Sequence, residues 1–222
     1  MDYTDCWYMA SCPRCPDECG ATCLRFAEML HLVESSNIPK ARWYTKPLLC
    51  YEDYDAFVRL QTIKLSIEEW VKSGNNLYLY SEKFGNGKTS WAIKLMLSYF
   101  NAIWAGNSFR TRGIFLSMPE FLDRNREVIS NRDPEFIAVR QAILECDLVI
   151  WDDITSTKMT DYNHSMLLNY LDARILANKS NIFTGNVGYE QMTDLLGGRL
   201  ASRICNTSES LQFIDADKRG LK

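Results

Sequence analysis

The sequence lacks any long apolar run, any internal repeat and any low-complexity segment. Its longest apolar runs, such as Leu148–Trp151, are far shorter than the roughly 20 residues that a membrane-spanning helix needs. The N-terminus is acidic and contains cysteine, whereas a signal peptide begins with basic residues followed by an apolar stretch. We therefore expect a cytoplasmic protein that does not bind membranes.

The sequence also lacks a surplus of basic residues, because 25 Lys and Arg stand against 28 Asp and Glu, for a formal net charge of −3. Proteins that bind nucleic acid over a large surface without sequence preference need an excess of positive charge. Any contact with nucleic acid should therefore be local. The 222 residues are enough for one substantial core and a short additional module.

Short apolar segments alternate with amphipathic patterns along most of the chain. The predicted strands are residues 77–80, 113–118, 147–151, 181–184 and 211–214, and the predicted helices among them are 90–104, 119–128, 134–145 and 162–179. Before the first strand, residues 24–33 predict a helix and residues 54–71 predict one long helix or two short ones. This alternation indicates an α/β fold with a parallel sheet covered on both faces.

Cysteine is concentrated at the start of the chain. Of the eight cysteines, five lie in the first tenth of the sequence, at Cys6, Cys12, Cys15, Cys19 and Cys23. In a reducing compartment such a cluster more often binds a metal than forms disulfides. Four thiolates make a closed tetrahedral site for Zn²⁺ or for an iron–sulfur cluster, and the residues do not separate the two. With five cysteines, and His31 soon after them, one or more donors would be spare.

The composition changes between residues 34 and 47, where Ser35–Pro39 interrupts a helical pattern and the chain becomes locally basic. This change predicts two domains. Residues 1–46 would be a small cysteine-rich metal-binding module with its linker, and residues 47–222 would be the α/β domain. So small a module has little apolar core, and a bound metal would supply its folding energy.

A glycine-rich loop follows the first strand of the predicted sheet and leads into a helix, as in a P-loop. Its glycines let backbone N–H groups turn toward the phosphates, Lys88 reaches the β- and γ-phosphates, and the Thr89 hydroxyl binds Mg²⁺. Glu82 stands where the full motif has its first Gly, but the residues that contact phosphate are retained. The predicted ATP-binding residues of this loop are Phe84, Gly85, Asn86, Gly87, Lys88, Thr89 and Ser90.

Two carboxylates follow the apolar strand at 147–151, namely Asp152 and Asp153. Carboxylates at the end of a buried strand are costly unless they meet a cation or an activated water. We expect Asp152 to bind Mg²⁺ together with Thr89, and Asp153 to orient or deprotonate the attacking water. The two motifs together predict a Mg²⁺-dependent ATPase.

Three further polar residues are candidates for catalysis. Asn186 follows the strand at 181–184 and is placed to reach the γ-phosphate and the water beside Asp153, although a turn Asn is the alternative. Arg199 and Arg203 lie four residues apart on a short predicted helix. An arginine that neutralises γ-phosphate charge in a neighbouring subunit stabilises the transition state. We favour Arg203 for this role, with Arg199 beside it, and a solvated basic helix face is the alternative.

These motifs resemble those of the AAA+ helicase loaders of the DnaC/DnaI type, particularly their phage and prophage versions. The resemblance covers about residues 50–215, through Ser81–Thr89, Asp147–Ile154, Ser180–Asn186 and Leu196–Arg203. It implies a AAA+ core with a five-stranded parallel sheet, ATP at a subunit boundary, and an arginine supplied by the next subunit. From that arginine we expect self-association into an oligomer. It also implies that the N-terminal domain binds the hexameric replicative DNA helicase, which the loader places on single-stranded DNA when replication begins.

The resemblance bears on two further predictions. The spacing of Cys6, Cys12, Cys19 and Cys23 is similar to that in phage members of the family, which implies these four as metal ligands, with Cys15 and His31 as alternates. The arginines of residues 107–112 and 124–126, interleaved with Phe109 and Phe115, are expected to line a groove for single-stranded DNA. Scattered arginines are more often a solvated surface, so this groove depends on the resemblance.

Two other functions are consistent with the same core. A transposition helper ATPase of the IstB type, which binds duplex DNA and a transposase, has similar motifs, and so does the initiator DnaA. A non-catalytic adaptor that keeps the nucleotide fold and sequesters a partner is a third reading, from a different class. Absence of ATP turnover with DNA and partner present would favour the adaptor.

Overall fold

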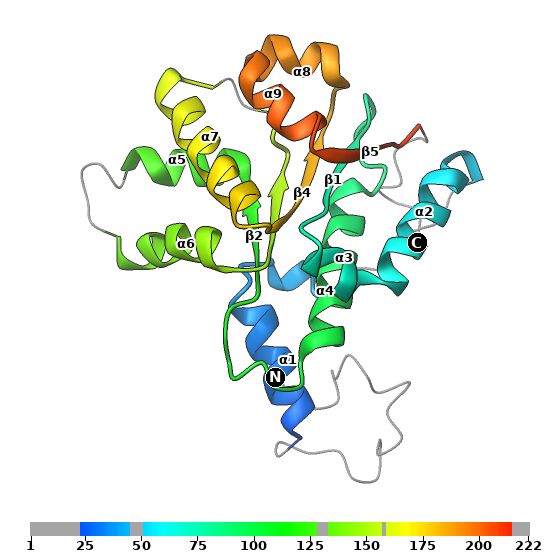
Figure 1. Ribbon diagram of the computed structural model, residues 1–222, viewed down its shortest axis with the longest axis vertical. Helices are drawn as coiled ribbons and strands as arrows, with labels where there is room; N and C mark the ends of the chain where they lie inside the picture. The colour runs from blue at the N-terminus through cyan, green and yellow to red at the C-terminus, as the bar shows by residue number, and fades with distance from the viewer. Residues whose placement is uncertain (1–22, 45–50, 128–132, 157–158, 215–222) are drawn as a thin grey trace.

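The computed structural model describes residues 23–44, 51–127, 133–156 and 159–214 (Figure 1). Cys6, Cys12, Cys15 and Cys19 lie outside these residues, and so does the predicted boundary at residue 46. The predicted division into two domains therefore stays a prediction.

The centre of the molecule is a five-stranded sheet in the order β2-β3-β4-β1-β5, in which every pair of neighbours is parallel. The strands are β1 (Asn76–Tyr80), β2 (Gly113–Ser117), β3 (Leu148–Asp152), β4 (Ser180–Gly185) and β5 (Ser208–Gln212). This confirms the predicted five-stranded parallel sheet. Because β4 lies between β1 and β3, the chain segments that follow these three strands lie side by side at the carboxyl ends of the strands. Below, this boundary of the sheet is called the sheet edge of the candidate site.

The helices are α1 (Leu24–Glu34), α2 (Tyr54–Leu65), α3 (Ile67–Lys72), α4 (Lys88–Ile103), α5 (Met118–Glu127), α6 (Pro134–Glu145), α7 (Asp161–Leu176), α8 (Tyr189–Leu196) and α9 (Gly198–Cys205). Two short 3₁₀ turns, Lys40–Arg42 and Tyr51–Asp53, precede α2. The predicted helix at residues 54–71 is two helices that divide at Ser66. In Figure 1, α8 and α9 lie near the edge where the strands end, and α1 lies at the opposite end of the molecule.

The sequence pattern predicts the last strand at residues 211–214. In the structure β5 begins three residues earlier, at Ser208. This strand is at the edge of the sheet and is only partly buried, so its sequence lacks the apolar run on which the prediction relied. Backbone pairing with β1 sets its position instead.

The sheet is buried on both faces, as the apolar strands predict. Leu77 and Leu79 of β1 belong to one core cluster, which contains residues of α1, α2, α3 and α4. Tyr78 between them faces the other cluster, which contains residues of α5, α6, α7, α8 and α9. Alternate residues of a strand point to opposite faces of a sheet, so β1 contributes to both.

The described residues of the predicted N-terminal module pack into the first of these clusters, through residues such as Leu32 and Trp43. The segment after α1 also covers the outer edge of β2. Ser36 O accepts a hydrogen bond from Phe115 N at 2.7 Å, and Asn37 Nδ2 donates to Phe115 O at 3.1 Å. Exposed strand edges pair readily with other chains, and this segment protects the β2 edge from such pairing.

A buried guanidinium joins three elements on the α7 side of the sheet. Arg174 of α7 is fully buried, and burial lowers its pKa, although a guanidinium stays charged in proteins. It donates to Ile143 O at 2.6 Å, to Ser180 O at 2.5 Å and to Asn181 Oδ1 at 2.7 Å. Further bonds go to Cys146 O and Asp147 O. Arg174 thus ties the end of α6 to the starts of β3 and β4.

Candidate nucleotide site

The glycine-rich loop joins β1 to α4 in a backbone conformation that favours glycine. Gly85 has φ 73° and Gly87 has φ 98°, values in the left-handed region that other residues rarely adopt. Gly87 caps the N-terminus of α4, which begins at Lys88. A Cβ placed on Gly87 would meet no atom of the described residues within 4 Å, so the space above the loop is open. Helix N-termini with open backbone N–H groups bind phosphate.

Lys88 is buried in this loop, and its Nζ donates to Lys83 O at 3.2 Å and to Asn86 Oδ1 at 3.1 Å. Both acceptors are neutral. Asn86 is itself buried, and its Nδ2 has no hydrogen-bond partner among the described residues. A buried donor without a partner is costly, and a phosphate oxygen would satisfy the Asn86 amide. The loop therefore fits a nucleotide phosphate.

Asp152 and Asp153 lie at the end of β3, two strands away from this loop. Asp152 is buried, and its burial raises the pKa of the carboxyl, while hydrogen bonds from Thr184 and Thr89 oppose the rise. The bond from Thr89 shows that the two predicted magnesium ligands are adjacent. A carboxylate and a hydroxyl are oxygen donors of the kind that Mg²⁺ prefers, so the pair fits the ion.

Asp153 is half-buried and has φ 55°, which is uncommon for a residue other than glycine. Its backbone N donates to the Thr184 hydroxyl at 2.9 Å. Strained backbone often occurs at functional residues. The conformation turns the chain sharply where the predicted catalytic carboxylate stands.

Asn186 follows β4, between the loop after β1 and the carboxylates of β3. Its backbone N donates to the Thr155 hydroxyl at 2.9 Å, and the next residue is held by a 2.6 Å bond from Tyr78 Oη to Val187 O. The Asn186 side chain makes no hydrogen bond to any described residue. The amide is thus positioned by its backbone and open to a ligand.

Sequence reasoning missed Thr184 and Thr155. The Thr184 hydroxyl binds Asp152 Oδ1 and Asp153 N, and the Thr155 hydroxyl binds Asn186 N. The signal was present, since Thr184 is a polar residue inside a strand whose other positions are apolar or glycine from Ile182 onward. Ser117, at the end of β2 and in register with Asp152, was also not predicted.

The predicted catalytic arginines are both on α9 and both exposed. Arg203 Nε forms an ion pair with Asp172 Oδ1 of α7 at 2.5 Å. Arg199, one turn earlier, forms no ion pair with a described residue. The two guanidinium groups therefore differ in how freely they can reach a second molecule.

Phe84 and Ser90 complete the predicted ATP-binding residues. Phe84 is 63% exposed at the tip of the loop, and Ser90 is half-buried in the first turn of α4. Their contacts with a nucleotide stay a prediction.

The predicted DNA groove is wrong in one of its aromatic residues. Phe115 is only 4% exposed and packs in the core with α1 and α4, because it faces inward from the second strand. Phe109 is exposed, with its ring edge against His31. Three of the arginines are in intramolecular ion pairs, which are Arg112–Asp147, Arg124–Asp133 and Arg126–Asp123.

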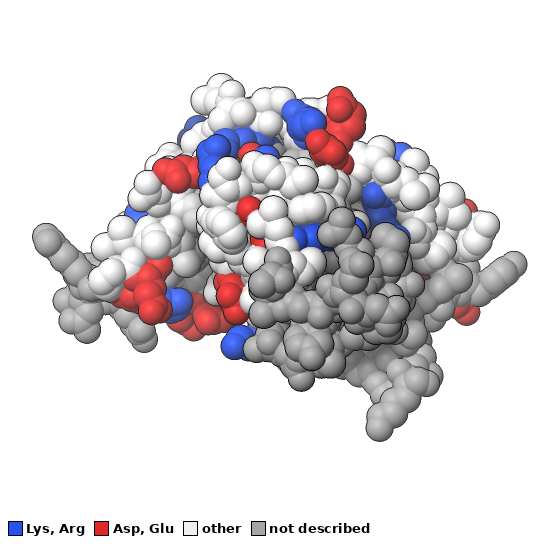
Figure 2. Space-filling view, turned by 90° about the horizontal axis from the view of Figure 1, so that it is seen from below, with Lys and Arg blue, Asp and Glu red and all other residues white. Residues whose placement is uncertain are grey.

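Charged side chains are mixed on the face of the molecule opposite the nucleotide loop. Figure 2 shows Lys and Arg interspersed with Asp and Glu there, without an extended area of one sign among the described residues.

The predicted cysteine metal site falls mainly outside the described residues. Cys23 precedes α1 as a free thiol, and His31 lies two turns further along the helix. The residues that the structure describes contain no group of three or more metal-binding side chains. The N-terminal metal stays a prediction.

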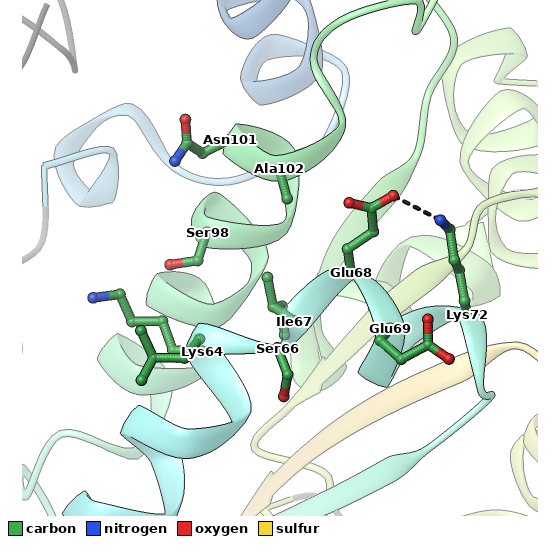
Figure 3. Close-up of a pocket in the computed structure, with 10 residues that line it drawn as sticks. Lys64, Ser66, Ile67, Glu68, Glu69, Lys72, Ser98, Asn101 and Ala102 are labelled. Carbon is green, nitrogen blue, oxygen red and sulfur yellow. Dashed lines mark hydrogen bonds and ion pairs between the residues drawn. The ribbon is translucent and has the colours of Figure 1, made fainter.

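A shallow hollow of about 540 Å³ lies between the α2–α3 junction and the second half of α4 (Figure 3). Its lining is of mixed charge, and Glu68 and Lys72 pair at its rim. Ser98 on its wall is ten residues along α4 from Lys88, which at 1.5 Å per residue is about 15 Å. This hollow is separate from the candidate nucleotide site.

No helix in the described part of the chain is long and apolar enough to cross a membrane.

No protein-family model matches the sequence, and no curated protein matches it either. Several solved structures do match the fold of this chain.

The DnaC helicase loader matches with a TM-score of 0.64 and 17% identity, over 79% of this chain and 99% of that chain. A DnaI structure matches with a TM-score of 0.65 and 16% identity, over 83% of this chain and 95% of that chain. This chain has the α/β fold of these proteins. The replication initiator DnaA, solved with AMPPCP and single-stranded DNA, matches with a TM-score of 0.58 and 16% identity, over 77% of this chain and 51% of that chain.

Proposed function

We propose that this chain is a cytoplasmic, Mg²⁺-dependent ATPase that binds a hexameric replicative helicase and loads it onto single-stranded DNA. One observation supports the proposed ATPase activity most strongly: three groups of residues lie together at the carboxyl ends of neighbouring strands. They are the Lys88 loop after β1, Asp152 and Asp153 at the end of β3, and Asn186 after β4. This is the set that phosphoryl transfer needs.

Each group has a part in hydrolysis. Lys88 and the backbone N–H groups of the loop bind the β- and γ-phosphates, and Asn86 is an additional donor. Thr89 and Asp152 would hold Mg²⁺, which when bound would neutralise part of the phosphate charge. Asp153 orients the attacking water, and Asn186 donates to the γ-phosphate or to that water. Catalysis of this kind depends on positioning and electrostatics more than on covalent chemistry.

The helicase-loading part of the proposal is supported by the structural neighbours. The chain matches nearly all of the DnaC helicase loader structure and about half of the DnaA structure. The DnaA structure was solved with single-stranded DNA and AMPPCP, which supports binding of both a nucleotide and single-stranded DNA by this fold. In this proposal the N-terminal cysteines bind Zn²⁺ or an iron–sulfur cluster and present the helicase-binding surface.

We expect Arg203 to act across a subunit boundary, which requires it to exchange Asp172 for the γ-phosphate of a neighbour. Arg203→Ala should leave nucleotide affinity unchanged but lower assembly-dependent ATP turnover at least about 100-fold, since such arginines contribute 10³–10⁵ in rate. Asp172→Asn is the matched control, because it frees Arg203 without removing it and should retain turnover.

The Arg203 measurement is steady-state hydrolysis across a range of protein concentrations, with Arg199→Ala in parallel. Normal turnover in Arg203→Ala, with loss in Arg199→Ala, would transfer the role to Arg199. Normal turnover in both would exclude a trans arginine on α9.

Native mass spectrometry tests the partner. The full-length protein, purified without oxygen, is mixed with the replicative helicase of the same cell, with and without ATP and Mg²⁺. We expect a defined loader–helicase complex, and a mass for the free protein that identifies its metal. Absence of a complex, together with ATP-dependent assembly on duplex DNA, would favour a transposition helper of the IstB type.

A further inference from the structure

One threonine hydroxyl contacts both residues of the acidic pair. Thr184 of β4 is fully buried, in the strand next to β3. Its Oγ1 donates to Asp152 Oδ1 at 2.7 Å and accepts from Asp153 N at 2.9 Å. Its backbone O accepts from Ile154 N, also at 2.9 Å. A single residue thus holds three consecutive residues of the other strand.

The direction of these hydrogen bonds is fixed. A hydroxyl has one proton to donate, and the backbone N–H of Asp153 can only donate, so it must point at the oxygen of Thr184. The proton of Thr184 is then free for the carboxylate of Asp152. This bond restrains Oδ1 of Asp152, and the remaining lone pairs of the carboxylate are left for Thr89 and a cation.

The same bonds stabilise the unusual backbone of Asp153. A non-glycine residue with φ 55° has a strained backbone. This conformation persists only when contacts with the surrounding residues hold it in place. The bonds from Asp153 N and Ile154 N to Thr184 lie on either side of the strained residue. They hold the turn from both sides, and the turn sets where the Asp153 carboxylate points.

We propose that Thr184 is a positioning residue that fixes the metal-binding carboxylate of Asp152 and the catalytic carboxylate of Asp153 in one geometry. The inference rests on the proposed ATPase function. Outer-shell partners of metal ligands commonly affect metal affinity or activity by about 10- to 100-fold. Thr184 is such a partner for Asp152, and it adds a backbone bond to the residue that acts on water.

The test compares Thr184→Val with Thr184→Ser in the full-length protein. Valine keeps the volume of threonine but has no hydroxyl, whereas serine keeps the hydroxyl and loses a methyl group. Two quantities are measured. One is the Mg²⁺ concentration at half-saturation for AMPPCP binding, which needs no turnover, and the other is the split between kcat and KM for ATP.

For Thr184→Val we expect kcat to fall about 10- to 100-fold and the Mg²⁺ half-saturation to rise about 10-fold. KM for ATP at saturating Mg²⁺ should change less than about threefold, because Lys88 and the loop are untouched. Thr184→Ser should keep both values within about threefold of the unmodified protein. Loss of packing alone would act on Thr184→Ser more than on Thr184→Val, and it would lower the thermal midpoint without moving the Mg²⁺ half-saturation.

Unmodified kcat and Mg²⁺ half-saturation in Thr184→Val would overturn the inference, and so would a Thr184→Ser variant as impaired as Thr184→Val. If Thr184→Val does not fold, Thr184→Cys replaces it, because a thiol is a weak donor of similar size, and the same shift is expected in smaller measure. An unmodified protein that binds AMPPCP but hydrolyses no ATP would contradict the proposed ATPase. The Mg²⁺ measurement would still decide the role of Thr184.

Discussion

Lys88→Ala should abolish the binding of ATP at micromolar concentrations. Lys88 is buried in the loop, with Nζ bound to two neutral oxygen acceptors that a phosphate can supplement. Truncating one partner of a buried charged contact costs about 2–5 kcal/mol, and about 3 kcal/mol is a loss of affinity above 100-fold. Titration with a fluorescent ATP analogue in the presence of Mg²⁺ measures the loss.

Lys83→Ala is the matched control for this prediction. Lys83 belongs to the same loop, but its side chain is exposed and its Nζ donates to Ile214 O at 2.8 Å, near the end of the described chain. Its removal should weaken nucleotide binding less than about threefold, as expected for one exposed hydrogen bond. Equal losses in the two variants would mean that the loop has collapsed, and the lysine role would then be unsupported.

Arg174→Met should lower the free energy of unfolding by about 3–5 kcal/mol, because several buried acceptors lose a hydrogen bond and each buried acceptor left unsatisfied costs about 1–3 kcal/mol. Methionine fills part of the volume but leaves the carbonyl groups of Ile143, Cys146 and Ser180 without this donor. Asn181 also loses a bond, although it keeps one from Trp151 Nε1. Urea denaturation followed by tryptophan fluorescence gives the difference.

Lys179→Met supplies the comparison for Arg174. Lys179 Nζ donates to Glu145 O and Cys146 O at the same end of α6, but the side chain is partly exposed, so water can replace it. We expect a loss of about 1 kcal/mol or less. An Arg174→Met variant within about 1 kcal/mol of the unmodified protein would show that the network contributes little to stability.

The placement of the candidate nucleotide-site residues was predictable from sequence because its signals are local. A loop with Gly85 and Gly87, a helix starting at Lys88, and acids at the end of an apolar strand each follow from a few consecutive residues. Parallel strands place their carboxyl ends at one edge, so the meeting of Lys88, Asp152 and Asn186 also follows from the α/β pattern. Nothing in that inference requires knowledge of distant contacts.

Other features depend on contacts that a local pattern does not contain. Arg174 sits in an amphipathic helix, and its partners are backbone carbonyls of other elements, which no side-chain pattern marks. Arg203 pairs with Asp172, 31 residues away, so the sequence alone gave no reason to separate it from Arg199. The arginines near Phe115 favour a groove, whereas strand alternation directs its side chain into the core.

The N-terminal segment was predicted only in part from the sequence. Its composition differs from that of the α/β domain, which led to the predicted division at residue 46. Residues such as Leu32 and Trp43 nevertheless pack with α4, and Ser36 and Asn37 bind the edge of β2. The described part of this segment therefore packs against the α/β domain.

The most direct test of the account is loading of the cognate hexameric helicase onto closed circular single-stranded DNA, which has no end over which a ring can thread. Helicase retained on the circles is measured after gel filtration. We predict retention only when the unmodified protein, ATP and Mg²⁺ are all present, and background retention with Lys88→Ala. Equal retention without this protein, or with Lys88→Ala in its place, would contradict the account.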